Sequence, residues 1–141
     1  WDIPYQSGEL VAEGCDNNGK VQSSYTIKTS GRPYALRASI DRVSLSKNRA
    51  TAHITLEVVD ENGIVVKLSD NDITCRIEGP ARLLGLEGSN NSDMGDYTDD
   101  HQRVYHGRLL AYIQTTGNKG PIHVKFTSPL LKGIEVVLNA E

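Results

Sequence analysis

Residues 51–58 constrain the fold of this chain most strongly, because apolar and polar side chains alternate along them without interruption. Alanine, isoleucine, leucine and valine occupy the even positions, whereas threonine, histidine and glutamate fill the odd ones. Successive side chains of a β-strand point to opposite faces of its sheet, so this pattern predicts a strand with one buried and one wet face.

Eight further segments have the composition of short strands, and turn residues such as Asn17-Asn18-Gly19 separate most of them. These segments are Leu10–Cys15, Val21–Lys28, Ala35–Asp41, Asp72–Glu78, Ala81–Leu86, Leu109–Gln114, Ile122–Thr127 and Ile134–Leu138. Asn62-Gly63 is a strong hairpin signal, so we also expect a return strand at Ile64–Val66. Many short strands with tight turns, and no helical period, predict an all-β antiparallel sandwich.

Length and composition limit the classes of protein to which the chain can belong. Its 141 residues, 38% of them hydrophobic, suffice for one domain with its own core. A net charge of −3 without a basic cluster argues against a nucleic-acid partner. No apolar run approaches the roughly 20 residues of a membrane span. The start, Trp1-Asp2-Ile3-Pro4-Tyr5, does not resemble a signal peptide, and we expect the chain to be a piece of a longer protein.

The cysteines and histidines do not have the spacing of a metal site. Cys15 and Cys75 are not part of a CxxC motif, so zinc and redox sites are weakly indicated. We expect two half-buried thiols in different strands, with a disulfide as the alternative in an exported protein. His101 and His106 lie five residues apart, a poor spacing for a shared metal on a strand. We therefore expect neither a metal site nor a cofactor.

The segment from Glu87 to Gly107 interrupts the rhythm of strands with about twenty residues that contain few apolar anchors. Loops of this length in compact domains are usually functional or pack on another element. Its Asp and Asn side chains suit turns, because they accept hydrogen bonds from nearby backbone N–H groups. An EF-hand pattern fails, because the three ligand positions before Gly95 hold Asn90, Ser92 and Met94. An irregular calcium cage of Asn91, Asp93 and Asp96 stays an alternative.

Sugar binding is a sharper hypothesis for the same loop. Carbohydrate modules stack sugar rings on exposed aromatic side chains and hold the hydroxyl groups with Asp, Asn and Arg. Tyr97 and Tyr105 flank the acidic part of this loop, with Arg103 between them. The competing interpretation is that Tyr105 packs inward and pins the loop. The candidate carbohydrate contacts are Asn90, Asn91, Asp93, Asp96, Tyr97, Arg103 and Tyr105.

Eight short phrases, spread over nearly the whole chain, share their order and spacing with a known family. They are Trp1–Ala12, Asn18–Val21, Thr29–Pro33, Val58–Gly63, Asp70–Ile73, Ile77–Gly85, Arg103–Arg108 and Ala111–Gln114. Thr29–Pro33 has the form T-a-G-x-P, and Val58–Gly63 has the form v-v-D-x-x-G. Together the phrases resemble the C-terminal region of glycoside hydrolase family 2 enzymes, the β-galactosidase-like group. Ser7 replaces a proline of the family pattern, and residues 88–93 replace its compact G-N-G-D.

The resemblance implies a division of the chain into two parts. Residues 1–30 correspond to the last two strands of a preceding immunoglobulin-like domain, and residues 33–141 to a complete C-terminal immunoglobulin-like β-sandwich. An isolated hairpin is marginally stable in water. We therefore expect residues 1–30 to pack against the sandwich or to pair with another copy of the chain, which would make a homo-oligomer.

The resemblance also implies a function. Family members cleave glycosidic bonds with two carboxylates about 5 Å apart, and both stand on an upstream (β/α)₈ barrel. No catalytic residue carries over to this chain. We expect a non-catalytic accessory domain of an exported bacterial enzyme, with the upstream catalytic domain as its partner. The alternatives are a carbohydrate-binding module that uses the 87–107 loop, and a spacer or adhesin-type immunoglobulin-like domain of a surface protein.

Overall fold

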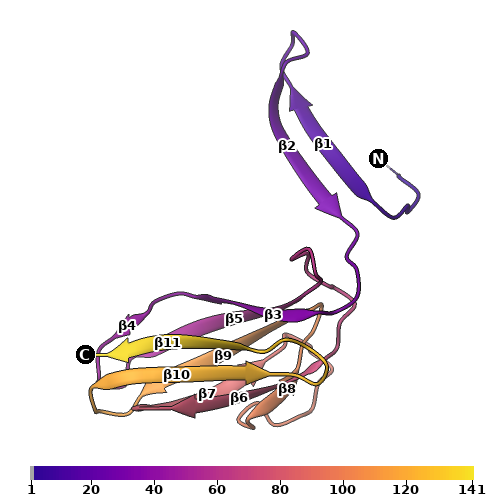
Figure 1. Cartoon of the computed structure of the whole chain (residues 1–141). Coiled ribbons are helices and arrows are strands. Elements are labelled where there is room, and N and C mark those ends of the chain that lie inside the picture. The colour runs from indigo at the N-terminus through magenta and orange to yellow at the C-terminus, as the bar shows by residue number, and fades with distance from the viewer. Residues whose placement is uncertain (1) are drawn as a thin grey trace.

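The structure, a computed structural model, describes residues 2–141, and all regular elements of this part of the chain are strands (Figure 1). In chain order they are β1 (Glu9–Cys15), β2 (Val21–Lys28), β3 (Ala35–Ile40), β4 (Ser44–Leu45), β5 (Thr51–Val59), β6 (Asp72–Glu78), β7 (Ala81–Glu87), β8 (His101–Arg103), β9 (Arg108–Thr115), β10 (Gly120–Thr127) and β11 (Ile134–Ala140). The predicted all-β class is confirmed.

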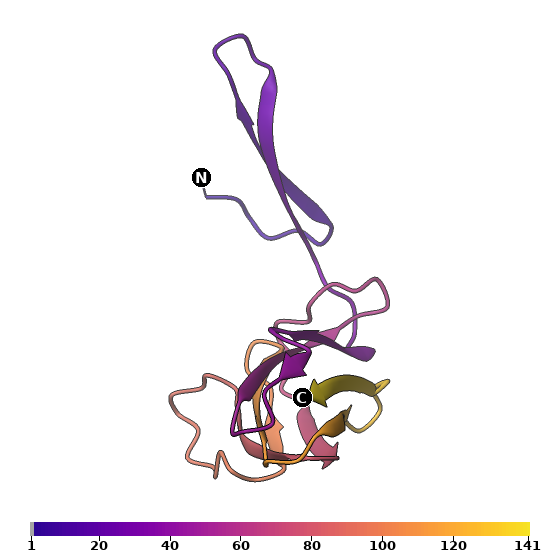
Figure 2. The same ribbon diagram turned by 90° about the vertical axis from the view of Figure 1, so that its left-hand side faces the viewer.

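Strands β3 to β11 form a two-layer sandwich of the immunoglobulin-like type. One sheet has the order β3-β5-β9-β7, and the other has the order β4-β11-β10-β6-β8. The pairs within both sheets are antiparallel except for β4 and β11, which run parallel. Figure 2 looks across the molecule from the side and shows the sandwich below the projecting hairpin.

The core lies between the two sheets and comes from the alternation that the sequence displays. In β5, the side chains of Ala52, Ile54, Leu56 and Val58 are fully buried. Across the gap, β10 buries Ile122, Val124 and Phe126. Each of these strands therefore has one buried face, as the period of two predicts.

Two details of the predicted strand pattern are wrong. Residues 64–66 do not form a return strand, because only a single bridge joins Val65 to Val59 and the chain then leaves β5. Two short strands were not predicted, namely β4 and β8, which lies inside the long loop. Strands of two or three residues are too short to show a period in the sequence.

The hairpin of β1 and β2 stands apart from the sandwich (Figures 1 and 2). Both strands are exposed along their whole length, and each pairs with the other in one antiparallel ribbon. The prediction that this segment packs against the sandwich is wrong. The two sheets of the sandwich already bury each other's apolar faces, so they offer the hairpin no apolar face.

Candidate functional site

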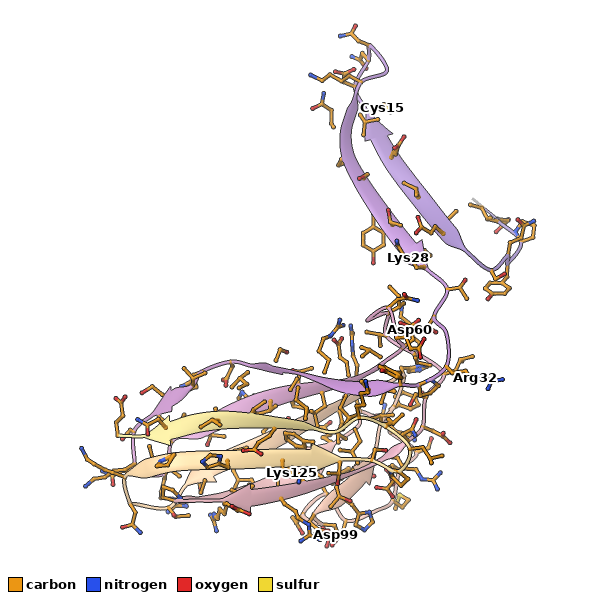
Figure 3. All side chains as sticks on the ribbon, in the orientation of Figure 1. Cys15, Lys28, Arg32, Asp60, Asp99 and Lys125 are labelled. Carbon is orange, nitrogen blue, oxygen red and sulfur yellow. The ribbon has the colours of Figure 1, made fainter. Side chains whose placement is uncertain are left out.

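The long loop between β7 and β9 is fastened to the sandwich at several points. The Leu86 N–H donates to the Tyr97 carbonyl oxygen at 2.8 Å, and the Cys75 N–H donates to the Asp100 carbonyl oxygen at 2.7 Å. Strand β8 then pairs with β6. The loop lies on the side of the sandwich away from the hairpin, where Figure 3 labels Asp99. It is therefore an ordered surface segment.

The Asn and Asp candidates in this loop hold its turns. The Asn90 side chain accepts from the Ser92 N–H at 3.1 Å, and Asp93 accepts from the Gly95 N–H at 2.9 Å. Asp96 accepts from both the hydroxyl and the N–H of Thr98, and these two bonds hold the pKa of its carboxyl below the ordinary value. These contacts are the turn chemistry that the sequence indicates.

The aromatic candidates are open to solvent. The exposed fraction is 48% for Tyr97 and 41% for Tyr105, so the interpretation in which Tyr105 packs inward is wrong. The ring of Tyr105 meets that of His106 edge-on, with centroids 4.1 Å apart. Arg103 has a loose ion pair with Asp70 at 3.8 Å, which leaves its guanidinium available. Asn91, the remaining candidate, is exposed.

The two cysteines occupy different strands and different environments. Cys15 is exposed in the hairpin, Cys75 is buried in the sandwich, and both are free thiols. Burial, reinforced by the charge of Asp100, raises the pKa of the Cys75 thiol to about 12. The thiols are therefore not the half-buried pair that the sequence predicted.

The described residues contain neither a metal-binding cluster nor a helix that could span a membrane. Within residues 2–141, no three side chains among His, Cys, Asp and Glu gather closely enough to hold a metal ion. His101 lies 3.4 Å from a carboxylate oxygen of Asp72, on the neighbouring strand. No helix in this part of the chain could cross a membrane.

A cluster of one carboxylate and two arginines lies outside the loop, on the exposed face of the β3-β5-β9-β7 sheet. Glu57 accepts from Arg37 at 2.6 and 3.0 Å on one side and from Arg108 at 3.0 Å on the other. Desolvation raises the pKa of Glu57, but the two arginines outweigh it, so the pKa lies below its ordinary value. The sequence placed Glu57 on a wet face, but it could not show its cross-strand partners because they depend on the register.

A second feature that sequence reasoning missed lies where the hairpin joins the sandwich. The Gly31 N–H donates to a carboxylate oxygen of Asp60 at 2.7 Å, although the two residues are 29 positions apart. Both belong to phrases that carried the family resemblance, Thr29–Pro33 and Val58–Gly63. Their presence in those phrases was the available signal, but no rule of local sequence pairs them.

Comparisons with known proteins agree with this architecture. Residues 36–137 match the family described as glycoside hydrolase family 2 C-terminal domain 5. A β-galactosidase of Bacteroides ovatus is 26% identical over 142 aligned residues, which cover 100% of this chain and 17% of that protein. A β-galactosidase of Thermoanaerobacter pseudethanolicus is 25% identical over 79% of this chain and 13% of its own length. The chain thus spans less than a fifth of these curated relatives.

A solved structure resembles the chain over its whole length. A glycosyl hydrolase family 2 member from Bacteroides cellulosilyticus has a TM-score of 0.94 at 25% identity, over 100% of this chain and 18% of its own. Residues 2–30 are about a fifth of the 141 residues. If the hairpin were oriented differently, these residues would not superpose, and the TM-score could not exceed about 0.8. The match therefore includes the hairpin, which that relative arranges similarly to its sandwich.

Proposed function

We propose that this chain, which belongs to the C-terminal domain 5 family of glycoside hydrolase family 2, is a non-catalytic accessory domain of a larger bacterial β-galactosidase-like enzyme. The family match over residues 36–137 carries the proposal. The small share of the β-galactosidase relatives that the chain covers supports a catalytic domain elsewhere in the same polypeptide. In this role the sandwich would support the catalytic domain or border its cleft.

The carboxyl groups of the chain support a non-catalytic role. A glycosidase needs a general acid whose pKa is raised, so that it holds a proton at working pH. In residues 2–141, the five carboxyl groups with a displaced pKa are all displaced downward. They are Asp16, Asp41, Glu57, Asp60 and Asp96. Each is held ionised by hydrogen bonds or by neighbouring cations, which is the opposite of what a proton donor requires.

Assays of the isolated chain and of the parent enzyme test this proposal. The purified 141-residue chain should release no p-nitrophenol from a p-nitrophenyl β-galactoside above the buffer control. The parent enzyme should cleave the same substrate. Turnover by the isolated chain that persists through a second purification would show that the chain is itself catalytic.

We also propose that residues 1–30 are the last two strands of a preceding immunoglobulin-like domain. The register of β1 and β2 places Leu10 opposite Ile27 and Ala12 opposite Tyr25, so one face of the ribbon is apolar. The opposite face carries the Glu9–Lys28 ion pair. An amphipathic ribbon of this kind suits the edge of a sandwich whose other strands cover its apolar face. Amide exchange in β1 and β2 should be slower in the parent than in the isolated chain.

Pairing of two hairpins in a homo-oligomer stays a prediction for the isolated chain. The apolar face of the hairpin could be covered by a second copy of the chain or by the rest of the preceding domain. Light scattering over a range of concentrations distinguishes these two cases. A dimer that is lost on Tyr25→Lys would favour a second copy, whereas a monomer would favour the preceding domain.

A carbohydrate-binding module is the second candidate function, and the exposure of Tyr97 and Tyr105 favours it. The two rings and the Arg103 guanidinium offer the apolar faces and donors that a sugar needs. Titration with galactose, followed by amide chemical shifts, should then perturb the 87–107 loop, and Tyr97→Ala should abolish the effect. An unchanged spectrum at millimolar sugar would remove this candidate. The spacer or adhesin alternative makes a different prediction, namely further sandwiches upstream in place of a barrel.

Export of the parent enzyme is a further part of the proposal. It rests on the family membership and on the bacterial origin of the relatives. Fractionation of the native host should place the enzyme outside the cytoplasm. Recovery of the activity with cytoplasmic markers would contradict export.

A further inference from the structure

The linker between the hairpin and the sandwich is short and held at one point. Thr29 still belongs to the hairpin, because its N–H donates to the Gly8 carbonyl oxygen at 2.8 Å. The sandwich begins at Tyr34, whose N–H donates to the Val59 carbonyl oxygen at 2.9 Å. For the intervening residues 30–33, the one hydrogen bond to the sandwich in the described chain is that from Gly31 to Asp60.

The Asp60 carboxylate is built into the loop that follows β5. The residue is 4% exposed, and its second oxygen accepts from the N–H groups of Asn62 at 2.9 Å and Ile64 at 2.8 Å. Its own N–H donates to the Ile64 carbonyl oxygen at 2.9 Å. Three N–H groups therefore converge on one carboxylate, which fixes its orientation. Figure 3 shows Asp60 at the junction, between the end of β2 at Lys28 and the sandwich.

The charge cluster on the sheet braces the same loop. Arg37 donates to the Gly63 carbonyl oxygen at 2.9 Å, and its guanidinium is held in place by Glu57. Glu57 is bound in turn by Arg108 on β9. The loop that carries Asp60 is thus tied through side chains to three neighbouring strands, β3, β5 and β9.

We propose that Asp60 is a hinge lock, which sets the angle of the hairpin by accepting the hydrogen bond of the Gly31 N–H. A Cβ at Gly31 would stand 3.4 Å from the carboxylate oxygen of Asp60, an ordinary contact distance, so the linker lies directly against this carboxylate. The inference concerns this chain by itself and holds whether or not the parent is a glycosidase. In a longer protein, the same bond would orient whatever precedes the sandwich.

A distance measurement between two spin labels tests the lock in the 141-residue chain. Cys15 on the hairpin is exposed and takes one label, and Lys125→Cys on the outer face of β10 takes the other. Cys75 is buried and stays unlabelled. Figure 3 labels Cys15 and Lys125, which lie on the two bodies that the hinge joins. The unaltered hinge should give one narrow distance distribution.

Two substitutions break the bond from opposite ends. Asp60→Ala removes the acceptor, and Gly31→Pro removes the donor while it keeps the Asp60 carboxylate in the chain. Either change should at least about double the width of the distribution, because the ends of a flexible linker of a few residues spread over roughly 10 Å. The Gly31 amide, which should exchange slowly in the unaltered chain, should lose its protection in Asp60→Ala.

Matched controls separate a hinge lock from a general loss of stability. Glu61→Gln removes the neighbouring carboxylate, and Val124→Ala destabilises the core far from the hinge; both should keep the narrow distribution. A narrow distribution in both Asp60→Ala and Gly31→Pro would overturn the proposal. If neither variant folds, ¹⁵N relaxation of the unaltered chain decides instead. One shared tumbling time for hairpin and sandwich supports the lock, and a shorter time for the hairpin refutes it.

Discussion

The hairpin and the sandwich follow the same sequence rule and end in opposite environments. In β5, alternate side chains such as Ile54 and Leu56 are fully buried. In the hairpin, the apolar face carries Leu10, which is 42% exposed, and Tyr25, which is 72% exposed. The sandwich strands have a second sheet above them, whereas the ribbon has none. Alternation therefore specifies which side chains share a face, and a separate layer determines whether that face is buried.

The two cysteines offer the sharpest test of this contrast. At pH 8, a thiol with a pKa of about 12 has about one molecule in ten thousand in the reactive thiolate form, and burial blocks access to it as well. A chromogenic disulfide reagent should therefore modify Cys15 at least about a thousandfold faster than Cys75. The second equivalent should react only after urea is added. Equal rates for the two thiols would mean that the sandwich opens readily in its native state.

Truncation of one large side chain in each region should give very different losses of stability. Phe126 is fully buried near the C-terminal end of β10, so Phe126→Ala should lower the free energy of unfolding of the sandwich by about 3–5 kcal/mol. Tyr25→Ala should change it by less than about 0.5 kcal/mol, because the ring is exposed and outside the core. Urea titration followed by far-ultraviolet circular dichroism measures both. A large loss for Tyr25→Ala would indicate that the hairpin packs on the sandwich in solution.

Substitution of two glycines with positive φ, one in each region, compares how tightly the backbone is packed there. Gly79 has φ +108°, and a Cβ there would lie 2.2 Å from the Pro121 carbonyl oxygen. Gly19 at the hairpin turn has φ +78° with no neighbour within 4 Å of such a Cβ. Gly79→Ala should therefore destabilise the sandwich by about 2–3 kcal/mol.

The effect of Gly19→Ala should stay within the hairpin and leave the thermal midpoint of the sandwich unchanged. Differential scanning calorimetry measures the midpoints of both variants. Similar shifts for the two would show that hairpin and sandwich unfold as one unit.

Substitution of Glu57 should have the smallest effect on the free energy of unfolding of the sandwich, and this effect should depend on pH. The pKa of Glu57 is lower in the folded chain than its ordinary value of 4.5, so its ion pairs contribute fully above pH 4.5. That contribution is lost as the pH falls through the lower, folded pKa. Glu57→Gln should cost about 1 kcal/mol at pH 7, a modest value because both arginines are half exposed.

The hairpin again provides the comparison for the ion pairs. Glu9→Gln removes an ion pair whose two partners are both about half exposed, and it should cost less than about 0.5 kcal/mol. Urea titrations at pH 7 and pH 3 measure both variants. A difference between Glu57→Gln and the unaltered chain that is as large at pH 3 as at pH 7 would contradict the charge argument.

Much of the fold followed from local patterns. The nine-residue β5 and the β10 strand show the period of two over their length, so their existence and their buried faces were predictable. The turn-forming role of Asn90, Asp93 and Asp96 was predictable for the same reason, since an Asx turn needs only neighbouring N–H groups. The short strands β4 and β8 were not predictable, because their pairing depends on partners distant in the sequence.

The sequence by itself determined the β class, the two faces of each long strand and the family resemblance, because those depend on side-chain order over a few residues. Only the tertiary structure decided that Gly31 meets Asp60, that Glu57 lies between two arginines, and that Tyr105 is open to solvent. The two contacts join segments that lie far apart along the chain, and the exposure of Tyr105 depends on how such segments pack. Their geometry depends on the register and stacking of whole sheets, which no local pattern encodes.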